Sequence, residues 1–599
     1  MQMKNILVLA VLSAMAFGNA LAEPIYVDTV AGLRQAVAEA TSGAEIVLRA
    51  SGSPYEFAET DFDTVGHLYA RVRIVLRGET DDPSDVVLVG NRNRILYLAD
   101  SNNRIRNLTF RDGDCTGYST RSEEPYDQVR GGAIAMRKED ASTVISNCVF
   151  QGCKSKSGGG ACGAYKANDT YAGVYQKCIF IGNETAGSGG ALYYAHTVDD
   201  CRFLTNKATS ATSLGGAICS AGTISKSFFF GNGLSWNGSI SGSTAVGGGA
   251  VYVPANTKFA AVSIADCEFS GNSVGQQSGA AVRAAHTGVT VSRCSFLNNA
   301  ATTGEGGGNG GALCDVSDVV ECSIVSNAAR FGGGAYNCRM SNCHMANNYA
   351  YRGGAAVDSV LCGCTNSANF SDDWNELGKK NVGCVAVDCL FSNLGSAGKK
   401  LFADSSFERC RFLNVTNGYL FANKVAMTNC LVACGGPFRF CQGLTVGSSM
   451  VNCTIVSNNY AMTSANEKVL TIENCLFFDN IISGTHVDVN ENARTFVESF
   501  SHCILSASSD EHIPGSYNLN YYGDATFNPR FVGSQSDPEN PFALQRRSPA
   551  VSKDGVVGDW MREATDIRGE GYPRLRDGKV DIGCYQCWIK PNGLMLIFR

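Results

Sequence analysis

Two adjacent pairs of aspartates, Asp199-Asp200 and Asp372-Asp373, are the residues best suited to chemistry in this sequence. Paired carboxylates can share the acid and base roles of glycoside hydrolysis. Asp200 stands just before a repeated cysteine, where other repeats carry Asn, Lys or Arg, so we interpret it as a solvent-facing repeat residue. Asp372 and Asp373 precede Trp374 in a polar stretch that breaks the repeat, and these three residues are the candidate glycan contacts. A solvated, protruding loop over 371–380 is the simpler alternative.

Histidine and cysteine spacing predicts no metal or cofactor site. The seven histidines are scattered along the chain without the short spacings typical of zinc ligands. Cys584 and Cys587 form a Cys-x-x-Cys pair, but no second pair or histidine lies near them in the sequence. A local disulfide or a coincidence is therefore favoured over a redox or zinc site. We assign no catalytic, cofactor-binding or metal-binding residue.

Half of the 26 cysteines open a repeated strand-like segment of the form Cys-x-Phe or similar. A free cysteine behaves as a small buried apolar side chain. An even number of cysteines in a secreted chain also fits disulfides, but parallel neighbouring strands hold their Cβ vectors parallel, which disfavours the disulfide torsion. We therefore favour a ladder of stacked thiols. Its members are Cys148, Cys178, Cys201, Cys267, Cys294, Cys322, Cys343, Cys389, Cys410, Cys430, Cys453, Cys475 and Cys503.

The repeat itself must position these side chains. In Cys178-Ile179-Phe180 the Cys and Phe lie two residues apart and therefore face the same side of a strand. Asn183 follows where the chain should turn, because Asn tolerates left-handed backbone geometry, and stacked Asn side chains could hydrogen-bond from coil to coil. Gly189-Gly190-Ala191 then makes a tight corner.

A period of about 20–30 residues with short apolar segments predicts three short strands per coil around a narrow core. This is an all-β, single-stranded parallel β-helix of about 17 coils, right-handed by the general preference of parallel connections.

The sequence divides into four predicted parts. Residues 1–22 are a signal peptide, 23–104 an N-terminal cap with the first coils, 105–505 the β-helix repeats, and 506–599 a C-terminal cap and tail. Leu33, Ala36 and Val37 have helical spacing and predict a short helix, ended by Gly43, that covers the open end of the first coil. Prolines and lost periodicity after about residue 525 predict an irregular segment over the other end.

Secretion is predicted by the N-terminus. Lys4, the apolar run over 6–16 and Ala20-Leu21-Ala22 form a cleavable signal with the expected cut after Ala22. No run of about twenty apolar residues follows, so we expect no integral membrane span. The formal charge is −6 without a basic block, which disfavours nucleic acid as a partner. We expect a monomer, with a polysaccharide or a host or cell-surface glycan as the candidate partner.

The paired Gly-Gly-Ala-Ile and Phe-x-x-Asn motifs resemble the repeats of polymorphic outer-membrane proteins, and residues 105–505 look like the pectin-lyase-like superfamily of right-handed parallel β-helices. The motifs Ser548-Pro549-Ala550, Asp566-Ile567-Arg568-Gly569 and Asp581-Ile582-Gly583-Cys584-Tyr585 are similar to a tail of many secreted bacterial β-helix proteins. The resemblance implies a bacterial secreted or cell-surface protein. The autotransporter barrel of polymorphic membrane proteins needs many alternating strands of about ten residues. No such run follows the repeats, so we do not expect anchoring by that route.

Three functions remain open. The uniform repeat and the lack of a catalytic cluster favour an adhesin or a structural or binding scaffold without catalysis. The superfamily resemblance implies, as an alternative, a polysaccharide lyase or glycoside hydrolase acting in a groove along the helix, although the His-Gly and Arg-x-Lys elements of polygalacturonases are missing. A glycan-binding module is the third. Convergence of three acidic or basic side chains in one groove is the observation that would best reduce the uncertainty.

Overall fold

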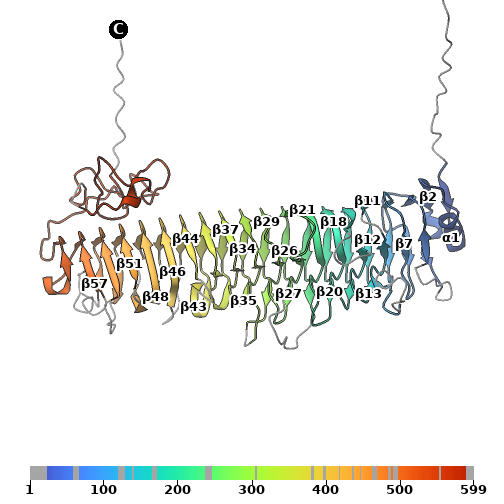
Figure 1. The fold of residues 1–599 in the computed structure, drawn as a ribbon, viewed down its shortest axis with the longest axis horizontal. Helices are drawn as coiled ribbons and strands as arrows, with labels where there is room; N and C mark the ends of the chain where they lie inside the picture. The colour runs from blue at the N-terminus through green and yellow to red at the C-terminus, as the bar shows by residue number, and fades with distance from the viewer. Residues whose placement is uncertain are drawn as a thin grey trace, which may run out of the picture.

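The coils stack along a single axis (Figure 1). The computed structural model describes residues 23–58, 67–118, 129–137, 140–164, 171–235, 246–303, 306–378, 383–394, 400–416, 419–434, 437–444, 447–461, 469–482, 488–489, 497–551 and 555–587. Neighbouring coils pair strand to strand in parallel, as in Phe180 beside Phe203. The predicted fold class is confirmed: the chain is an all-β parallel β-helix.

Coils that carry the Gly-Gly-Ala motif contain four strand segments rather than the predicted three. In the coil around Ile218, left-handed residues mark four corners at Gly215, Ser220, Lys226 and Gly231, with φ of 68°, 64°, 48° and 63°. Each such residue bends the chain sharply between two strands. The extra corner, at Ser220, was not predicted because the residue type at this corner varies from coil to coil, as Tyr194 and Asp315 show. We name the four rows of stacked segments the Cys-x-Phe row, the Asn row, the Gly-Gly-Ala row and the pre-Cys row.

The Cys-x-Phe row forms its own sheet. Its strands are β3 (Tyr55–Glu56), β6 (Val87–Val89), β9 (Thr109–Arg111), β12 (Val149–Gln151), β16 (Ile179–Ile181), β19 (Arg202–Leu204), β22 (Phe228–Phe230), β26 (Glu268–Ser270), β30 (Ser295–Leu297), β34 (Ser323–Val325), β38 (His344–Ala346), β42 (Thr365–Ser367), β45 (Leu390–Ser392), β47 (Arg411–Leu413), β49 (Leu431–Ala433), β52 (Thr454–Val456), β55 (Leu476–Phe478), β58 (Ile504–Leu505) and β60 (Leu519–Asn520).

The other three rows share one continuous sheet because several long strands pass from one row into the next. The Asn row holds β13 (Lys154–Ser155), β17 (Glu184–Thr185), β20 (Lys207–Ala208), β23 (Gly233–Leu234), β27 (Ser273–Val274), β31 (Ala300–Ala301), β35 (Ala328–Phe331), β39 (Tyr349–Arg352), β53 (Asn459–Ala461) and β56 (Ile481–Ile482). The Gly-Gly-Ala row holds β4 (Leu68–Ala70), β7 (Leu96–Leu98), β10 (Ile134–Met136), β14 (Cys162–Ala164), β24 (Val251–Val253), β28 (Val282–Ala284), β32 (Leu313–Cys314), β36 (Ala335–Tyr336) and β40 (Ala356–Val357).

The pre-Cys row ends just before the ladder cysteines. It holds β1 (Ile25–Val27), β2 (Ala44–Leu48), β5 (Ile74–Gly78), β8 (Arg104–Arg106), β11 (Asp140–Ser146), β15 (Ala172–Gln176), β25 (Val262–Ala265), β29 (Val289–Ser292), β33 (Asp318–Val320), β37 (Arg339–Ser341), β41 (Val360–Cys362), β44 (Val385–Val387), β51 (Ser448–Val451), β54 (Leu470–Glu473), β57 (Val497–Ser501) and β59 (Gly515–Ser516). The strands that span two rows are β18 (Leu192–Asp199), β21 (Ile218–Ser225), β43 (Phe370–Gly378), β46 (Lys400–Glu408), β48 (Tyr419–Thr428) and β50 (Pro437–Leu444).

The core of the Cys-x-Phe row is a stack of phenyl rings beside a column of thiols. Neighbouring rings such as Phe203 and Phe229 lie 4.8 Å apart between centroids at an interplanar angle of 4°. All thirteen predicted ladder cysteines are buried, and none is in a disulfide. The backbone N–H of Cys267 donates to the sulfur of Cys294 at 3.4 Å, so the column is linked from coil to coil. The alternating strand pattern therefore gives both side chains the inward orientation that their spacing predicts.

A buried asparagine ladder runs beside this core. Asn272 donates through Nδ2 to the Oδ1 of Asn299 at 2.9 Å and to the carbonyl of Phe229 at 3.0 Å. The members are Asn183, Asn206, Asn232, Asn272, Asn299, Asn327, Asn348 and Asn369, all buried. Hydrogen bonding from coil to coil is thus confirmed, but the predicted left-handed geometry of the Asn itself is wrong. The residue before it, for example Gly271 with φ of 62°, makes the turn, which leaves the Asn side chain free to point inward.

A buried carboxyl group ends the later part of this ladder. Asn458 donates to Asn480, which donates to Asp488 Oδ1 at 2.7 Å. Asp488 also accepts from the Ser506 N–H at 2.8 Å and from the Tyr521 hydroxyl. Burial outweighs these hydrogen bonds and raises the pKa of Asp488 to about 6.

This raised pKa predicts a pH effect on stability. The folded protein holds the Asp488 proton more tightly than the unfolded chain does, so the contribution is largest below the unfolded pKa, 3.8, and is lost as pH rises through about 6. Relative to Asp488→Asn, the wild type should gain about 2 kcal/mol of unfolding free energy between pH 7 and pH 4. Urea unfolding of both proteins across this range measures the difference, and a constant difference would contradict the assignment.

The N-terminal helix forms where its spacing predicts, but it ends at Ala38, before the predicted stop at Gly43. Helix α1 (Val30–Ala38) is capped by Thr29, whose hydroxyl accepts the Gly32 N–H at 3.1 Å, and it buries Leu33 against the first coils. It lies at one end of the stack (Figure 1). Within the described ranges, no helix has the length and apolarity that crossing a bilayer requires.

The C-terminal segment (residues 525–587) lies along the side of the helix instead of covering its end (Figure 1). It packs against outward-facing apolar residues of the Cys-x-Phe row, including Leu431, Val456 and Leu476. Polar contacts fix its position: Asn474 exchanges two hydrogen bonds of 2.8 Å with the backbone of Val556. The expectation of an end cap is therefore wrong, because the last coils carry apolar side chains on their outer face and must bury them there.

Candidate functional site

Asp372 lies on a strand. The expected protruding loop is instead the first part of β43, whose Phe370 and Ser371 pair with Tyr349 and Ala350 of β39. The backbone of Asp373 and Trp374 continues in the same strand, and the pairing slips in register between Ala350 and Arg352. The sequence break thus marks an irregularity in the ladder. The side chains of Asp373 and Trp374 lie outside the part of the structure that can be described.

Aromatic side chains surround Asp372 on the outer face of the Asn row. Tyr349 and Phe370 stack with ring centroids 5.8 Å apart at an angle of 13°. Tyr349 donates through its hydroxyl to Asp372 Oδ2 at 2.6 Å. The guanidinium of Arg352 lies 5.7 Å from the ring centroid of Tyr351. We call Tyr349, Tyr351, Arg352, Phe370 and Asp372 the Tyr349 surface.

The alternation of the two strands places these residues outside. In β39, Ala350 is fully buried while Tyr351 is 39% exposed. In β43, Ser371 is buried while Phe370 is 43% exposed. Large aromatic rings that remain exposed side by side on a rigid sheet are a common feature of binding surfaces. Sequence reasoning missed Tyr349, Tyr351 and Phe370; the Tyr-Ala-Tyr alternation was the available signal.

The chemistry of the Tyr349 surface is that of recognition. Hydrogen bonding to Asp372, together with partial burial, raises the pKa of Tyr349 to about 12, so the phenol stays protonated and donates. Asp372 is exposed and retains an oxygen, Oδ1, to which Tyr349 does not donate. Aromatic faces can cover the apolar C–H faces of sugar rings, while a carboxylate and a guanidinium can bond their hydroxyl or carboxylate groups.

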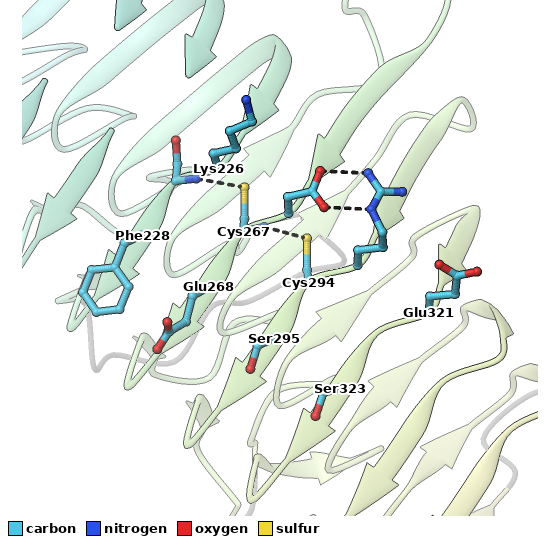
Figure 2. Close-up of a pocket in the computed structure, with 11 residues that line it drawn as sticks. Lys226, Phe228, Cys267, Glu268, Cys294, Ser295, Glu321 and Ser323 are labelled. Carbon is cyan, nitrogen blue, oxygen red and sulfur yellow. Dashed lines mark hydrogen bonds and ion pairs between the residues drawn. The ribbon is translucent and has the colours of Figure 1, made fainter. Parts of the chain in front are cut away.

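Charged side chains also gather at the corner before the ladder cysteines. Figure 2 shows Lys226 and Glu321 at this edge, with Phe228, Glu268 and Ser295 projecting from successive strands. Between them, Arg293 forms two hydrogen bonds of 2.7 and 2.8 Å with Asp266 (Figure 2). This pairing lowers the pKa of Asp266 and raises that of Arg293, so neither group exchanges a proton near neutral pH.

The residues around Asp266 and Arg293 line a first groove. A second groove of about 590 Å³ follows the Gly-Gly-Ala row. Arg283 Nη2 lies 3.4 Å from Asp315 Oδ2, and Asn337 donates to the other Asp315 oxygen at 2.8 Å. Asp358 accepts the Gly383 N–H at 3.0 Å, and His286 Nδ1 accepts the Gly288 N–H at 2.8 Å. Acidic and basic side chains therefore do converge in grooves. The carboxylates of Asp266, Asp315 and Asp358 hold hydrogen-bond partners there. Glu268 and Glu321, in contrast, line the first groove without a hydrogen bond to another described residue.

The acid pairs considered for catalysis, to which we assign no catalytic role, do not lie beside a described carboxyl group whose pKa is raised. Asp199 accepts the Ser225 hydroxyl at 2.7 Å, and Asp200 occupies a corner with φ of 53°, as a repeat residue. Among the described carboxyl groups, those with a raised pKa are Glu473 and Asp488. Neither lines the two grooves or belongs to the Tyr349 surface. No group of three or more metal-ligating side chains is found in the described ranges.

Cys584 and Cys587 are free buried thiols, so the local disulfide favoured by the sequence is not formed. The backbone N–H of Cys584 donates to Thr454 at 3.0 Å and that of Cys587 to Asp581 at 2.7 Å. Burial raises the pKa of the Cys584 thiol to about 12, opposite to the shift of a reactive thiolate. The pair therefore helps to seat the C-terminal segment on the coils.

No protein-family model and no curated protein sequence matches the chain. The chain is similar to solved structures of other parallel β-helix proteins. Pectate lyase Pel9A shares 11% identity at a TM-score of 0.30, over 62% of this chain and 88% of that one. Tailspike protein 3 of bacteriophage CBA120 shares 11% at 0.23, over 79% and 58%. A variant of the PL6-family alginate lyase AlyGC shares 10% at 0.23, over 84% and 98%. Likenesses this distant carry no argument about activity or ligand.

Proposed function

We propose that this protein is a secreted or cell-surface β-helix that binds a polysaccharide through the Tyr349 surface without cleaving it. The observation that carries the proposal is the exposed ring of Phe370 stacked on the half-buried ring of Tyr349 beside Asp372. Two rings held on a rigid sheet lose little conformational freedom on binding, which favours recognition of an extended chain. Secretion through the signal at residues 1–22, which lie outside the described ranges, is part of the same proposal.

The absence of catalysis is proposed from the state of the polar groups. Hydrolysis needs a protonated acid opposite an ionised carboxylate or base. On the Tyr349 surface the carboxylate of Asp372 accepts a hydrogen bond from a tyrosine whose pKa is raised, so the pair does not supply both roles at neutral pH. In the two grooves, the ion pairs of Arg293 with Asp266 and of Arg283 with Asp315 argue in the same direction.

Replacing Phe370 with alanine should weaken polysaccharide binding about two- to tenfold. The substitution removes one ring of the stack, and a well-placed aromatic contact contributes about 0.5–1.5 kcal/mol. A glycan array read with the wild type, Phe370→Ala and Tyr351→Ala measures this effect. The Tyr351 variant should lose binding to the same glycans.

Val385→Ala is the matched control. Val385 lies on β44 of the pre-Cys row and is 42% exposed, close to the 43% of Phe370. This variant should bind like the wild type. An equal loss of binding in the control, or unchanged binding in both aromatic variants, would show that the ligand does not bind at the Tyr349 surface.

A further inference from the structure

The corner residues before the Cys-x-Phe row alternate in charge along six successive coils, five of them before a ladder cysteine and one, Lys226, before Ser227. They are Lys177, Asp200, Lys226, Asp266, Arg293 and Glu321. All six are exposed, and each has a left-handed backbone, with φ between 48° and 56°. Asn147 and Asn342, which carry no charge, hold the same corner on the coils at either side. The six charges therefore alternate in sign along the row, and an uncharged asparagine stands at each end of it.

Such a row is complementary to itself under a two-fold axis. An axis between the coils of Lys226 and Asp266, perpendicular to the row, sets a second copy antiparallel to the first. Lys226 then faces the Asp266 of the other copy, Asp200 faces Arg293, and Lys177 faces Glu321. Every facing pair has opposite charge, and each contact occurs twice, as in an isologous interface.

A parallel row of side chains that are apolar except for Ser270 obeys the same symmetry. The third residues of β16, β19, β22, β26, β30 and β34 lie in register across neighbouring strands. They are Ile181, Leu204, Phe230, Ser270, Leu297 and Val325. The two-fold axis sets Ile181 against Val325 and Leu204 against Leu297. Phe230 and Leu297 are 47% and 38% exposed, so a second copy would remove apolar surface from water.

The same outer face already serves as a docking face further along the helix. From β47 onward the C-terminal segment covers it, beginning where Arg411 donates to Asn540 at 3.0 Å. Between the axis and β47 lie β26, β30, β34, β38, β42 and β45. On the other side lie β22, β19, β16, β12, β9, β6 and β3. The seventh strand from the axis is β47 on one side and β3 on the other. In the antiparallel pair, the C-terminal segment of each copy therefore begins opposite β3 of the other copy. It does not lie between the two faces.

We propose that the outer face of β16 to β34 binds a second copy of this chain as an antiparallel two-fold dimer. A shift by one coil would bring like charges together, so the alternating row fixes the register. With coils about 4.8 Å apart and strands rising about 3.3 Å per residue, the face covers roughly 500 Å² per copy. This is below the about 800 Å² of a standard interface, so the dimer should be reversible and dependent on concentration. It would replace the monomer expected from the sequence.

Sedimentation equilibrium of the mature chain over a concentration series tests this proposal. The wild type should show a rising average mass that decreases at high salt. Lys226→Glu should raise the dimer dissociation constant at least about tenfold, because it creates two like-charge contacts. The double variant Lys226→Glu with Asp266→Lys exchanges the partners across the axis and should restore association.

The apolar row is tested by Leu297→Asp, with Val385→Asp as an equally exposed control away from this face. The first should abolish dimerisation and the second should not, while thermal unfolding verifies that both fold. A wild type that stays monomeric up to about 1 mM overturns the proposal. A dimer that survives both Lys226→Glu and Leu297→Asp, or that the double variant fails to restore, also overturns it.

Discussion

Asn348→Ala is expected to destabilise the protein by about 3–4 kcal/mol, one of the largest effects of any single change in the repeats. Asn348 is fully buried and donates to the carbonyl of Ile324 at 2.8 Å and to Asn369 Oδ1 at 2.9 Å. It also accepts both the backbone and the side-chain N–H of Asn327 at 3.0 Å. Alanine would take this partner away from the buried Ile324 carbonyl and from the buried Asn327 backbone N–H, at about 1–3 kcal/mol each, while Asn327 Nδ2 and Asn369 Oδ1 keep other hydrogen bonds.

The adjacent residue provides the control for this prediction. Asn347 is exposed and has φ of 54°, the left-handed geometry that glycine adopts without strain. Asn347→Gly should therefore change the unfolding free energy by no more than about 0.5 kcal/mol. Urea unfolding of the two variants gives both values. Equal destabilisation by the two changes would show that the ladder contributes no more than the turn.

Phe229→Ala should cost about 4 kcal/mol. The ring is fully buried and stacks between Phe203 and Phe269, with centroid distances of 4.8 and 4.6 Å. Its removal leaves a cavity inside a continuous column, and a solenoid coil can collapse only against its two neighbours. Denaturant unfolding, with hydrogen exchange to locate the affected coils, measures the loss.

Phe230→Ala is the matched control, because the next residue carries the same ring on the opposite face of the strand. Phe230 is 47% exposed, so its truncation should cost less than about 1 kcal/mol. If both variants lose the same stability, the inward and outward faces of β22 would not differ as the structure requires.

The repeat made the core predictable from the sequence, but not the corners. Cys178 and Phe180 lie two residues apart in a strand, and period-two alternation alone turns both inward. The identity of the turning residue could not be derived in this way. Asn was assigned to the turn from its general tolerance of left-handed geometry. Its amide is instead needed inside the ladder, and the preceding residue, such as Asn347, adopts the left-handed backbone.

The candidate site was only partly predictable from the sequence, because the register of strand pairing decides which residues lie side by side. Asp372 was identified because it lies in a polar stretch that breaks the repeat. Its neighbours Tyr349 and Tyr351, however, belong to the preceding coil. Coil lengths vary along the chain, so the residues that stack on one another emerge only from the strand pairing. The segment that looks like a loop in the sequence is the strand β43, whose pairing with β39 slips in register.

The C-terminal segment was misplaced although a signal was present. Leu431-Val432 and Leu476-Phe477 are apolar on both faces of their strands, as Phe228-Phe229-Phe230 is in an earlier coil. A strand that is apolar on both faces is buried on both faces. This pattern predicts a covering element along the side of the last coils, where the segment lies.

Affinity electrophoresis through gels that contain single polysaccharides tests the central claim most directly, when the chain length of the polysaccharide is measured before and after the run. We predict that at least one polysaccharide retards the wild type and Val385→Ala but not Phe370→Ala, and that its chain length stays constant. Equal retardation of Phe370→Ala, or shortening of the polysaccharide by the wild type, would contradict a non-cleaving binding function at the Tyr349 surface.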